Sequence, residues 1–300
     1  MSAHAADHQY DDHDLGLHHD IVVLERLNRR RALGLLGLGA GALALGGCGG
    51  DDSGSTGSSG SVAATPTPTP SATATPTPGA TGGTCTAFAS ETNGPYPADG
   101  TNTSQGSTSN VLTLSSFQRS DIRSSVGIGT AAPGVTTTVT LTMVDVNNAC
   151  SPLAGYAVYL WHCDAVGDYS LYDQPNESWL RGVQVTDANG QVTFTTIFPG
   201  CYAGRYPHIH FEVFSSLANA TSGRYARLIS QIAMPADACS AVYADTAVYG
   251  GSGGRFAATS IADDGIFADN SDAQQAAMML VASGSPATGY TTSATVGLTT

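Results

Sequence analysis

The stretch that decides the fold runs from Phe198 to Phe214 and reads FPGCYAGRYPHIHFEVF. Residues two apart in a β-strand point to the same face of the sheet, so His208 and His210 would lie side by side. Ile209 would face the opposite side, where the alternation of apolar residues continues. The segment therefore predicts a strand with one apolar face and one face that carries two imidazoles. A bare His-x-His pair more often makes ordinary hydrogen bonds than it binds a metal. The neighbouring residues are therefore needed to distinguish the two possibilities.

Tyrosines flank the histidine pair. Tyr202 and Tyr206 precede it, and Tyr169 lies in the segment WHCDAVGDYS. A phenol has a pKa of about 10 and must lose its proton to bind a metal. A strongly acidic ion such as Fe(III) can enforce that loss, whereas zinc more often recruits cysteine, histidine or carboxylate. Two histidines with two tyrosines favour ferric iron, although period two also places Tyr206 on the histidine face.

Further segments occur in order along the chain. They are GPYPADG at 94–100, PLAGYAVYLWHCDAVGDYS at 152–170, LRGVQVTDANGQVTFTTIFPGCYAGRYPHIHFEVF at 180–214 and LISQI at 228–232. Together they resemble the intradiol ring-cleavage dioxygenases, the family of the catechol and protocatechuate dioxygenases. The resemblance runs from about residue 85 to 300 and implies a β-sandwich core of that type. One departure is the loop before the histidines: Tyr202 precedes His208 by six positions, and better-known members have a much longer loop there.

The resemblance implies a centre with non-haem Fe(III) as cofactor. Its metal ligands would be Tyr169, Tyr202, His208 and His210. Tyr202 is chosen over Tyr206 because it occupies the Pro-Gly-x-Tyr position that carries the ligand in relatives. The implied reaction is cleavage of a catechol-type ring by O₂, which gives a muconate-type diacid. The partners would be a small catechol-type molecule and O₂; the sequence indicates neither which catechol nor the oligomeric state.

Three residues would act on the substrate, again by resemblance. Tyr202 would leave the metal and take up a substrate proton, and Arg205 would stabilise negative charge on the substrate ring. Gln231 matches a glutamine near the reacting carbon. His162 is expected to support the site or the fold rather than to bind the metal, and Tyr96 of the GPYPADG segment would line the pocket.

Composition limits the other possible functions. The chain has 300 residues, a formal charge of −13 and no lysine, with 24 acidic against 11 basic residues. Such a surface repels phosphate backbones, so nucleic-acid binding is not expected. Only 12% of the residues are charged, and Gly, Thr, Ser and Ala are abundant, as in many exported β proteins.

The N-terminal region has the features of an export signal. A twin-arginine-like cluster, NRRRALG at 28–34, precedes a thirteen-residue apolar run at 33–45, which is too short to span a bilayer. The run ends in a lipobox-like sequence at Cys48, the expected lipidation site; the alternative is a buried helix followed by an ordinary cysteine. Residues 1–47 are therefore predicted to be a signal region. Residues 48–84 are predicted to be a disordered Gly/Ser/Thr/Pro linker, and 85–300 the catalytic domain. The protein would lie in the cell envelope or on its outer face and touch the membrane only through the lipid.

Short segments rich in Thr, Val, Leu and Ile predict an all-β sandwich with irregular loops. The expected strands are 136–146, 157–162, 182–186, 192–197, 209–214 and 228–233. Asn189-Gly190 predicts a hairpin turn between the third and fourth of them. Residues 274–281 have the Ala, Gln and Met content of a helix, but the resemblance favours a strand paired with 290–298.

Five cysteines follow residue 84, so at least one of them has no partner among the others. They are Cys85, Cys150, Cys163, Cys201 and Cys239. Cys163 and Cys201 both lie beside presumed ligand segments, where they would form either a disulfide or two buried thiols.

Two other classes of function compete with the enzyme. One is a tethered β-sandwich that binds carbohydrate or phenolic ligands without turnover, and the other is a zinc or copper site that uses the histidine pair alone. The combination of two tyrosines, two histidines, an arginine and a glutamine argues against the binding module, because a binder needs no such set.

The lipidation site gives a first prediction. Cys48→Ser should release the protein from membranes without changing its specific activity, because the lipid is the only expected attachment. Membrane fractionation followed by mass spectrometry of the mature N-terminus measures this. An intact N-terminus on cytoplasmic protein would contradict the export hypothesis.

Overall fold

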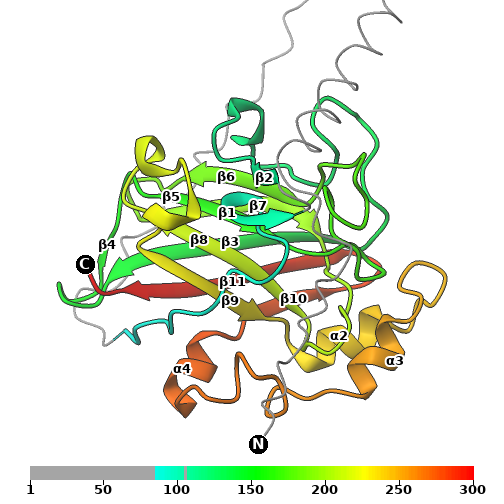
Figure 1. The fold of residues 1–300 in the computed structure, drawn as a ribbon. Helices are drawn as coiled ribbons and strands as arrows, with labels where there is room; N and C mark the ends of the chain where they lie inside the picture. The colour runs from blue at the N-terminus through cyan, green and yellow to red at the C-terminus, as the bar shows by residue number, and fades with distance from the viewer. Residues whose placement is uncertain (1–84, 105–106) are drawn as a thin grey trace, which may run out of the picture. The chain divides into compact units, whose positions relative to one another are not determined.

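Two β-sheets packed face to face form the body of the described residues, 85–104 and 107–300, in a computed structural model (Figure 1). The larger sheet has the order β10-β11-β3-β4, with β7 also paired to β3, and the smaller sheet has the order β6-β5-β8-β9. A ribbon of two strands, β1 and β2, is separate. The expectation of an all-β sandwich is confirmed.

The elements have the following bounds. The strands are β1 Asp99–Ser104, β2 Ser107–Asn110, β3 Thr136–Asp145, β4 Ser151–Pro152, β5 Ala157–Trp161, β6 Arg181–Val185, β7 Gln191–Ile197, β8 His208–Phe214, β9 Leu228–Ala233, β10 Val281–Ser285 and β11 Gly289–Leu298. The helices are α2 Ala236–Val242, α3 Ser252–Ala257 and α4 Asp272–Ala277, and the 3₁₀ turns are η1 Ser115–Phe117, η2 Leu217–Asn219 and η3 Gly223–Tyr225. The six strands predicted from the sequence are present to within one residue at each end.

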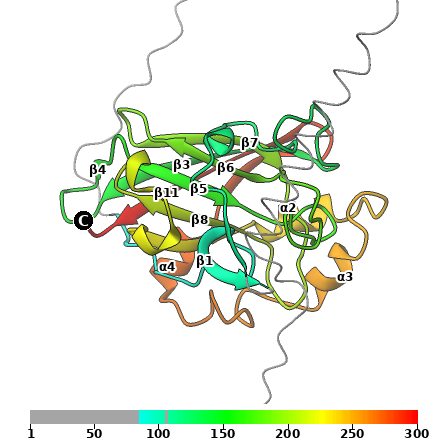
Figure 2. The same ribbon diagram turned by 45° about the horizontal axis from the view of Figure 1, so that its top comes forward.

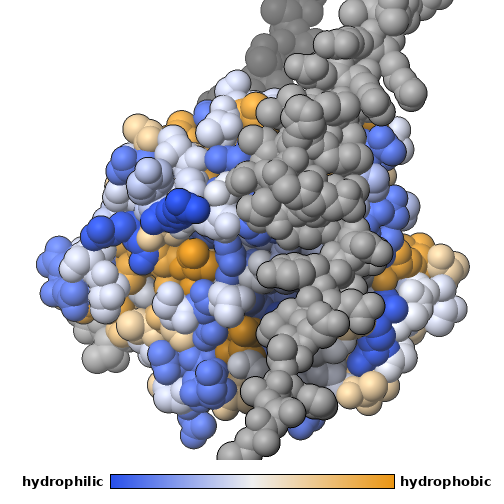
Figure 3. Space-filling model, in the orientation of Figure 1, coloured by the Kyte–Doolittle hydropathy of each residue, from blue (hydrophilic) through white to orange (hydrophobic). Residues whose placement is uncertain are grey.

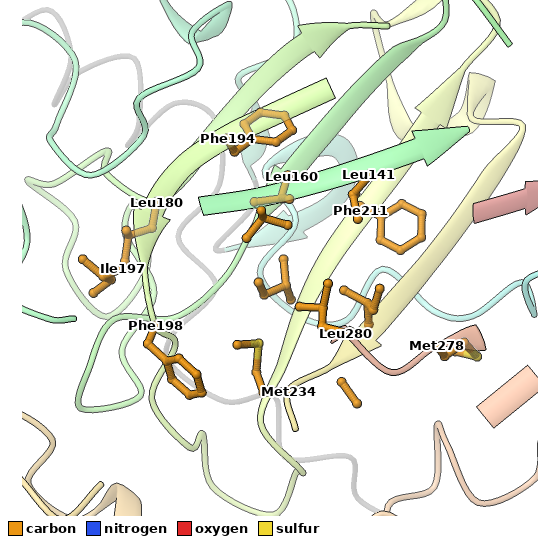
Figure 4. Close-up of a cluster of buried hydrophobic side chains, with 14 of the residues drawn as sticks. Leu141, Leu160, Leu180, Phe194, Ile197, Phe198, Phe211, Met234, Met278 and Leu280 are labelled. Carbon is orange, nitrogen blue, oxygen red and sulfur yellow. The ribbon is translucent and has the colours of Figure 1, made fainter. Parts of the chain in front are cut away.

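The main hydrophobic core lies between the two sheets. Leu141 of β3 and Phe194 of β7 meet Leu160 of β5 and Phe211 of β8 there, and all four side chains are fully buried (Figure 4). Alternation along each strand supplies these residues, as the sequence predicts. At about 1.5–3 kcal/mol for each buried side chain of this size, the core is the main source of stability.

The opposite face of β5 and β8 is also covered. There Tyr159 and Trp161 of β5 lie next to the even-numbered residues of β8, among them His210 and Glu212. Figures 1 and 2 both place β1 beside β8, and the 163–180 region contributes further buried residues to this second cluster. Every residue of β8 is therefore buried, and the two imidazoles stand on a covered face rather than on the surface.

The predicted hairpin at Asn189-Gly190 is wrong. The turn forms, with hydrogen bonds between Asp187 and both Gly190 and Gln191, but β6 pairs with β5 whereas β7 pairs with β3. The two strands thus cross from one sheet to the other. The turn itself packs on β3, since a Cβ on Gly190 would lie 2.4 Å from the Met143 carbonyl oxygen. Packing of the sheets against each other outweighs the local hairpin preference.

The strand predicted at 274–281 is also wrong. Its first half is the end of helix α4, which begins with a capping box: the Ser271 hydroxyl accepts from the Gln274 amide, and the Gln274 side chain accepts from the Ser271 amide. The chain becomes extended only after Met278, and β10 then pairs with β11 as an antiparallel hairpin. The capping box explains why the helical alternative holds here.

The cysteines resolve into one disulfide and three buried thiols. Cys85 pairs with Cys150, and this bond closes a loop of 65 residues. In the loop-entropy model, the lost entropy raises the free energy of the unfolded chain by about 4 kcal/mol and so stabilises the fold. Cys163 and Cys201 are not bonded to each other, and with Cys239 they are buried free thiols. The second of the two alternatives for Cys163 and Cys201 is therefore the correct one.

The surface of the described residues offers few apolar groups. The large hydrophobic residues that are exposed are scattered; they are Val166, Val185, Tyr225 and Val281. The coloured part of Figure 3 shows hydrophobic residues in small patches among polar ones. Within the described ranges, no helix is both long and apolar enough to cross a bilayer. The predicted signal region, Cys48 and the linker lie outside these ranges.

Glu212 gives a prediction about stability. Its buried carboxyl faces that of Asp99, and both pack against Gly223. Burial and the Asp99 carboxylate hold the pKa of Glu212 well above its usual range, so the folded protein keeps a proton that the unfolded chain releases. This contribution to stability is full below the ordinary carboxyl pKa and is lost as pH rises.

Glu212→Gln has nearly the same shape as the protonated glutamate but does not titrate. The variant should lose stability less steeply than the wild type as pH rises from about 5 to about 8. Chemical unfolding across this range measures the slope, and Asp272→Asn, which changes an exposed carboxylate, serves as the control. Equal slopes in wild type and Glu212→Gln would mean that Glu212 is ionised in the folded protein.

Candidate metal centre

Three side-chain atoms converge on the covered face of the smaller sheet. The Nε2 atoms of His208 and His210 lie 3.0 Å apart, and the Tyr169 hydroxyl lies 3.3 Å from the His210 Nε2. The histidines come from β8, whereas Tyr169 comes from the loop after β5. All three side chains are at most 3% exposed. Strand pairing therefore assembles, from distant segments, a compact group of nitrogen and oxygen donors.

Each imidazole is oriented by a different contact. His208 Nδ1 lies 2.5 Å from the Tyr206 carbonyl oxygen, so this nitrogen carries the hydrogen and Nε2 keeps its lone pair. The His210 ring stacks on Trp161, with the ring centres 4.9 Å apart and the planes 8° apart. Gly94 closes the other side: its φ is +74°, and a Cβ there would lie 3.1 Å from His210 Cε1. The two rings are thus held with their Nε2 atoms facing inward.

Burial keeps both imidazoles neutral. It lowers the pKa of His208, with a further contribution from the positive charge of Arg205. Burial likewise lowers the pKa of His210, and His208 adds to the effect. Neutral imidazole is the form that binds metal, so the sheet holds the two histidines ready as ligands at neutral pH.

Tyr169 is fixed in place and holds its proton firmly. Its backbone amide donates to Asp173 Oδ2 at 2.8 Å, and its ring lies 4.7 Å from that of Tyr96. Burial raises the pKa of the Tyr169 phenol well above its usual range. Without a strong positive charge nearby, the group stays protonated. A metal that binds it must therefore be a strong Lewis acid.

Tyr202 and Tyr206, the two candidates for the second tyrosine ligand, lie in different places. The Tyr202 ring centre lies 5.8 Å from that of Tyr169 and 6.4 Å from that of His208, at the edge of the cluster. Tyr206 instead packs against Phe256 of helix α3 and belongs to the main hydrophobic cluster. The strand begins only at His208, so period two does not extend back to Tyr206. Of the two, only Tyr202 has its ring among the donor side chains.

Arg205 and Gln231 are brought together beside the histidines. Gln231 lies opposite His210 in the β8–β9 register, and its Oε1 accepts a hydrogen bond of 2.7 Å from Arg205. Arg205 Nε also donates to both carboxylate oxygens of Asp264, at 2.9 and 3.1 Å. Its guanidinium is thus clamped on two sides. The Arg205–Asp264 ion pair is therefore largely buried and is not a mobile pair on the surface.

Asp264 is a site residue that the sequence analysis missed. Burial raises its pKa, but hydrogen bonds from Arg205 and from the Tyr206 and Ile266 amides outweigh this, so the pKa lies below its usual range. The carboxylate therefore stays charged. Asp264 lies 59 positions after Arg205, so no local sequence pattern could have predicted that the two residues pair. The sequence around it, DDG, indicates only a turn.

His162 has a structural position. Its Nδ1 lies 2.7 Å from the Cys163 carbonyl oxygen and its Nε2 lies 2.6 Å from the Thr196 hydroxyl, so both ring nitrogens are occupied. Burial lowers its pKa to about 4. As expected from the sequence, His162 supports the fold around the site.

The donor set fits ferric iron better than zinc. Among the described residues, no group of three or more His, Cys, Asp or Glu side chains is placed to hold a metal. The histidine pair alone is therefore two donors short of the tetrahedral zinc site. The nearby phenols supply the missing donors, and phenolate oxygen is a ligand for hard ferric iron. Four donors, Tyr169, Tyr202, His208 and His210, would hold such an ion.

Comparison with known proteins finds dioxygenases. A model of the dioxygenase family matches residues 114–250, which include both histidines and both tyrosines. The domain is therefore similar to dioxygenases, and its fold resembles that of the intradiol ring-cleavage enzymes. An intradiol ring-cleavage dioxygenase from Tetranychus urticae is 24% identical, with 72% of this chain and 95% of that chain covered and a TM-score of 0.52. A second solved dioxygenase is 25% identical, with the same shares covered and a TM-score of 0.54.

A further similar structure is the dioxygenase domain of a dioxygenase and carbohydrate-binding protein fusion from Streptomyces sp. SirexAA-E, which is 22% identical, with 71% of this chain and 99% of that chain covered and a TM-score of 0.44. No curated protein matches the chain. The similarity to dioxygenases thus rests on the family model over residues 114–250 and on the fold shared with the first two structures.

The buried ion pair gives a prediction. Asp264→Ala should lower the stability by about 3–5 kcal/mol, because it leaves a charged, partly buried guanidinium without its partner. Chemical unfolding measures the loss. Asp121→Ala is the matched control, since the Arg123–Asp121 pair is exposed and should contribute at most about 1 kcal/mol. Similar losses of stability in the two variants would show that the Arg205–Asp264 pair stabilises the fold no more than a surface ion pair does.

Proposed function

We propose that this domain is a non-haem Fe(III)-dependent intradiol dioxygenase that cleaves a catechol-type ring with O₂ to a muconate-type diacid. The observation that carries the proposal is the convergence of two imidazole Nε2 atoms and the Tyr169 hydroxyl on one buried face, with the Tyr202 ring beside them. The match to the dioxygenase family model supports the class of reaction, and this donor set supports the metal.

The metal would be held by Tyr169, Tyr202, His208 and His210. When bound, ferric iron supplies a Lewis acid and a template for the two adjacent oxygens of a catechol. The protein supplies neutral imidazoles that are buried away from water, and two phenols whose deprotonation the ion can support.

The two tyrosines differ in burial. Tyr169 is almost fully buried and tied by its backbone to Asp173, whereas Tyr202 is half-buried just before a turn. Tyr202 is thus the more accessible of the two phenols, and its deprotonated oxygen is the group proposed to take the first proton from a substrate hydroxyl. This agrees with the role that the family resemblance implies for it.

Arg205 and Gln231 would act on the substrate ring. Arg205 is clamped by Asp264 and Gln231, so its positive charge needs no reorganisation when negative charge develops nearby. Gln231 is also anchored, because its Nε2 donates to the Thr92 carbonyl at 3.0 Å. A fixed cation in a site with little water is an effective stabiliser of an electron-rich ring.

Aromatic side chains near the metal site suit a flat substrate. The Tyr96 ring centre lies 4.7 Å from that of Tyr169, 5.1 Å from that of Tyr172 and 6.1 Å from that of Tyr202. On the loop between Tyr202 and the histidines, a Cβ on Gly204 would meet no atom within 4 Å. A group of aromatic rings beside the donors, together with a short loop that has free space at Gly204, supports a substrate site that tolerates substituents on the ring.

We also propose that the domain works outside the cytoplasm. The Cys85–Cys150 disulfide supports this, because such bonds persist in oxidising compartments. The predicted signal and lipidation site at Cys48 would deliver the protein there.

The test of the proposed function is the colour and oxygen uptake of the iron-loaded protein. It should be red to burgundy, because tyrosinate-to-Fe(III) charge transfer absorbs visible light. Tyr169→Phe and His208→Ala should remove or greatly weaken the visible band. Tyr206→Phe is the matched control, since its ring packs in the core away from the donors.

Oxygen uptake then tests the reaction. Catechol and ring-substituted catechols should be cleaved, whereas a monomethyl ether should bind without turnover because one of its two chelating oxygens is blocked. Colourless protein with stoichiometric zinc would overturn the ferric proposal. Turnover of the monomethyl ether would contradict chelation by both hydroxyls.

A further inference from the structure

The two segments that carry the tyrosines touch each other through their backbones. The Gly200 amide donates to the Asp164 carbonyl at 2.9 Å, and a Cβ on Gly200 would lie 2.5 Å from the Ala165 carbonyl oxygen. Gly200 stands two positions before Tyr202, and Ala165 stands four before Tyr169. The contact is close enough that only glycine fits at position 200.

A buried serine from helix α3 joins the same two segments. The Ser252 hydroxyl donates to the Ala165 carbonyl at 2.8 Å and accepts from the Cys201 amide at 3.1 Å. Its side chain is fully buried. One hydroxyl therefore uses both its donor and its acceptor capacity to link the segment before Tyr169 to the segment before Tyr202.

An arginine on the next turn of α3 repeats this link. Arg255 Nε donates to the Cys201 carbonyl at 2.5 Å, and another guanidinium nitrogen of Arg255 donates to the Val166 carbonyl. Both backbone groups of Cys201, the residue directly before Tyr202, are thus bonded to α3. The rigid, planar guanidinium is well suited to span two carbonyls.

Two tyrosines of the α2–α3 region hold the preceding part of the Tyr202 segment. The Tyr243 hydroxyl donates to the Pro199 carbonyl at 2.9 Å, and the Tyr249 hydroxyl donates to the Phe198 carbonyl at 3.0 Å. Figures 1 and 2 place α2 and α3 at the same end of the sandwich. The Tyr202 segment is therefore fastened along its length up to residue 201.

We propose that α3 is a bracket that sets the separation of the two tyrosine side chains, with Ser252 and Arg255 as positioning residues. The proposal rests on the proposed function, in which both phenols hold the metal. The bracket fixes the backbone up to Cys201, while the Tyr202 side chain stays half-buried. The Tyr202 phenol therefore moves by rotation of its side chain and not by movement of the loop.

The first test needs no metal. In metal-free protein, Arg255→Ala and Ser252→Ala should each speed amide hydrogen exchange in both segments, 164–168 and 199–203, by about tenfold, because each removes hydrogen bonds that join them. Arg123→Ala, which removes a half-buried arginine whose partner is the exposed Asp121, is the control. Unchanged exchange, or faster exchange in only one segment of the folded variants, would overturn the bracket.

The second test uses the iron-loaded protein. Arg255→Ala should shift the visible band and lower kcat by about tenfold with little change in KM, because the misplaced phenol is a reacting group. The shift should be much smaller in a Tyr202→Phe background, where only Tyr169 contributes. Arg255→Lys should recover part of the effect, since lysine can satisfy one carbonyl at a time.

The two proposals can fail separately. An equal band shift with and without Tyr202 would overturn the bracket, because Arg255 would then act elsewhere. A wild-type protein without any visible band, whose variants still show faster exchange in both segments, would leave the bracket as a structural device and overturn the ferric site.

Discussion

The double burial of β8 is the constraint on which the rest of the structure depends. Its odd-numbered residues, such as Phe211, pack into the core between the sheets, whereas its even-numbered residues face a second covered layer. An imidazole on that layer loses water on every side, which keeps it neutral and leaves its inward nitrogen for a metal. One face of this seven-residue strand thus packs in the core, and the other face carries the two histidines. A register shift of one residue would put His208 and His210 into the core.

The covered layer has to be built from segments that are far apart in the sequence. The N-terminal segment supplies Gly94 against His210 and Tyr96 against Tyr169, and the chain after β5 supplies Tyr169 itself. Arg181 holds this layer together, because its guanidinium donates to the Tyr96 carbonyl and to Ser170. A buried arginine with its donors satisfied by backbone and hydroxyl groups orders loops that have little secondary structure of their own.

Charge is used sparingly around the site. In a protein with a formal charge of −13, the arginine nearest the histidines is clamped between Asp264 and Gln231. The clamp fixes the position of the cation and prevents it from turning toward other carboxylates. Arg255 of α3 likewise has a fixed position, but it donates to backbone carbonyl oxygens rather than to carboxylates. Such groups position their neighbours, because in a buried setting a satisfied hydrogen bond has a defined direction.

From the sequence alone we could predict six of the strands and the face of β8 that carries the histidines. Those features follow from periodicity and from residue types, which are local properties. The sequence also indicated Tyr202, but only through its resemblance to relatives. Tertiary structure alone decided that β6 and β7 join different sheets and that Cys85 pairs with Cys150. It alone placed Asp264 against Arg205 and α3 across the two tyrosine segments. These contacts join residues far apart in the chain, and which of many possible partners meet depends on how the whole core packs.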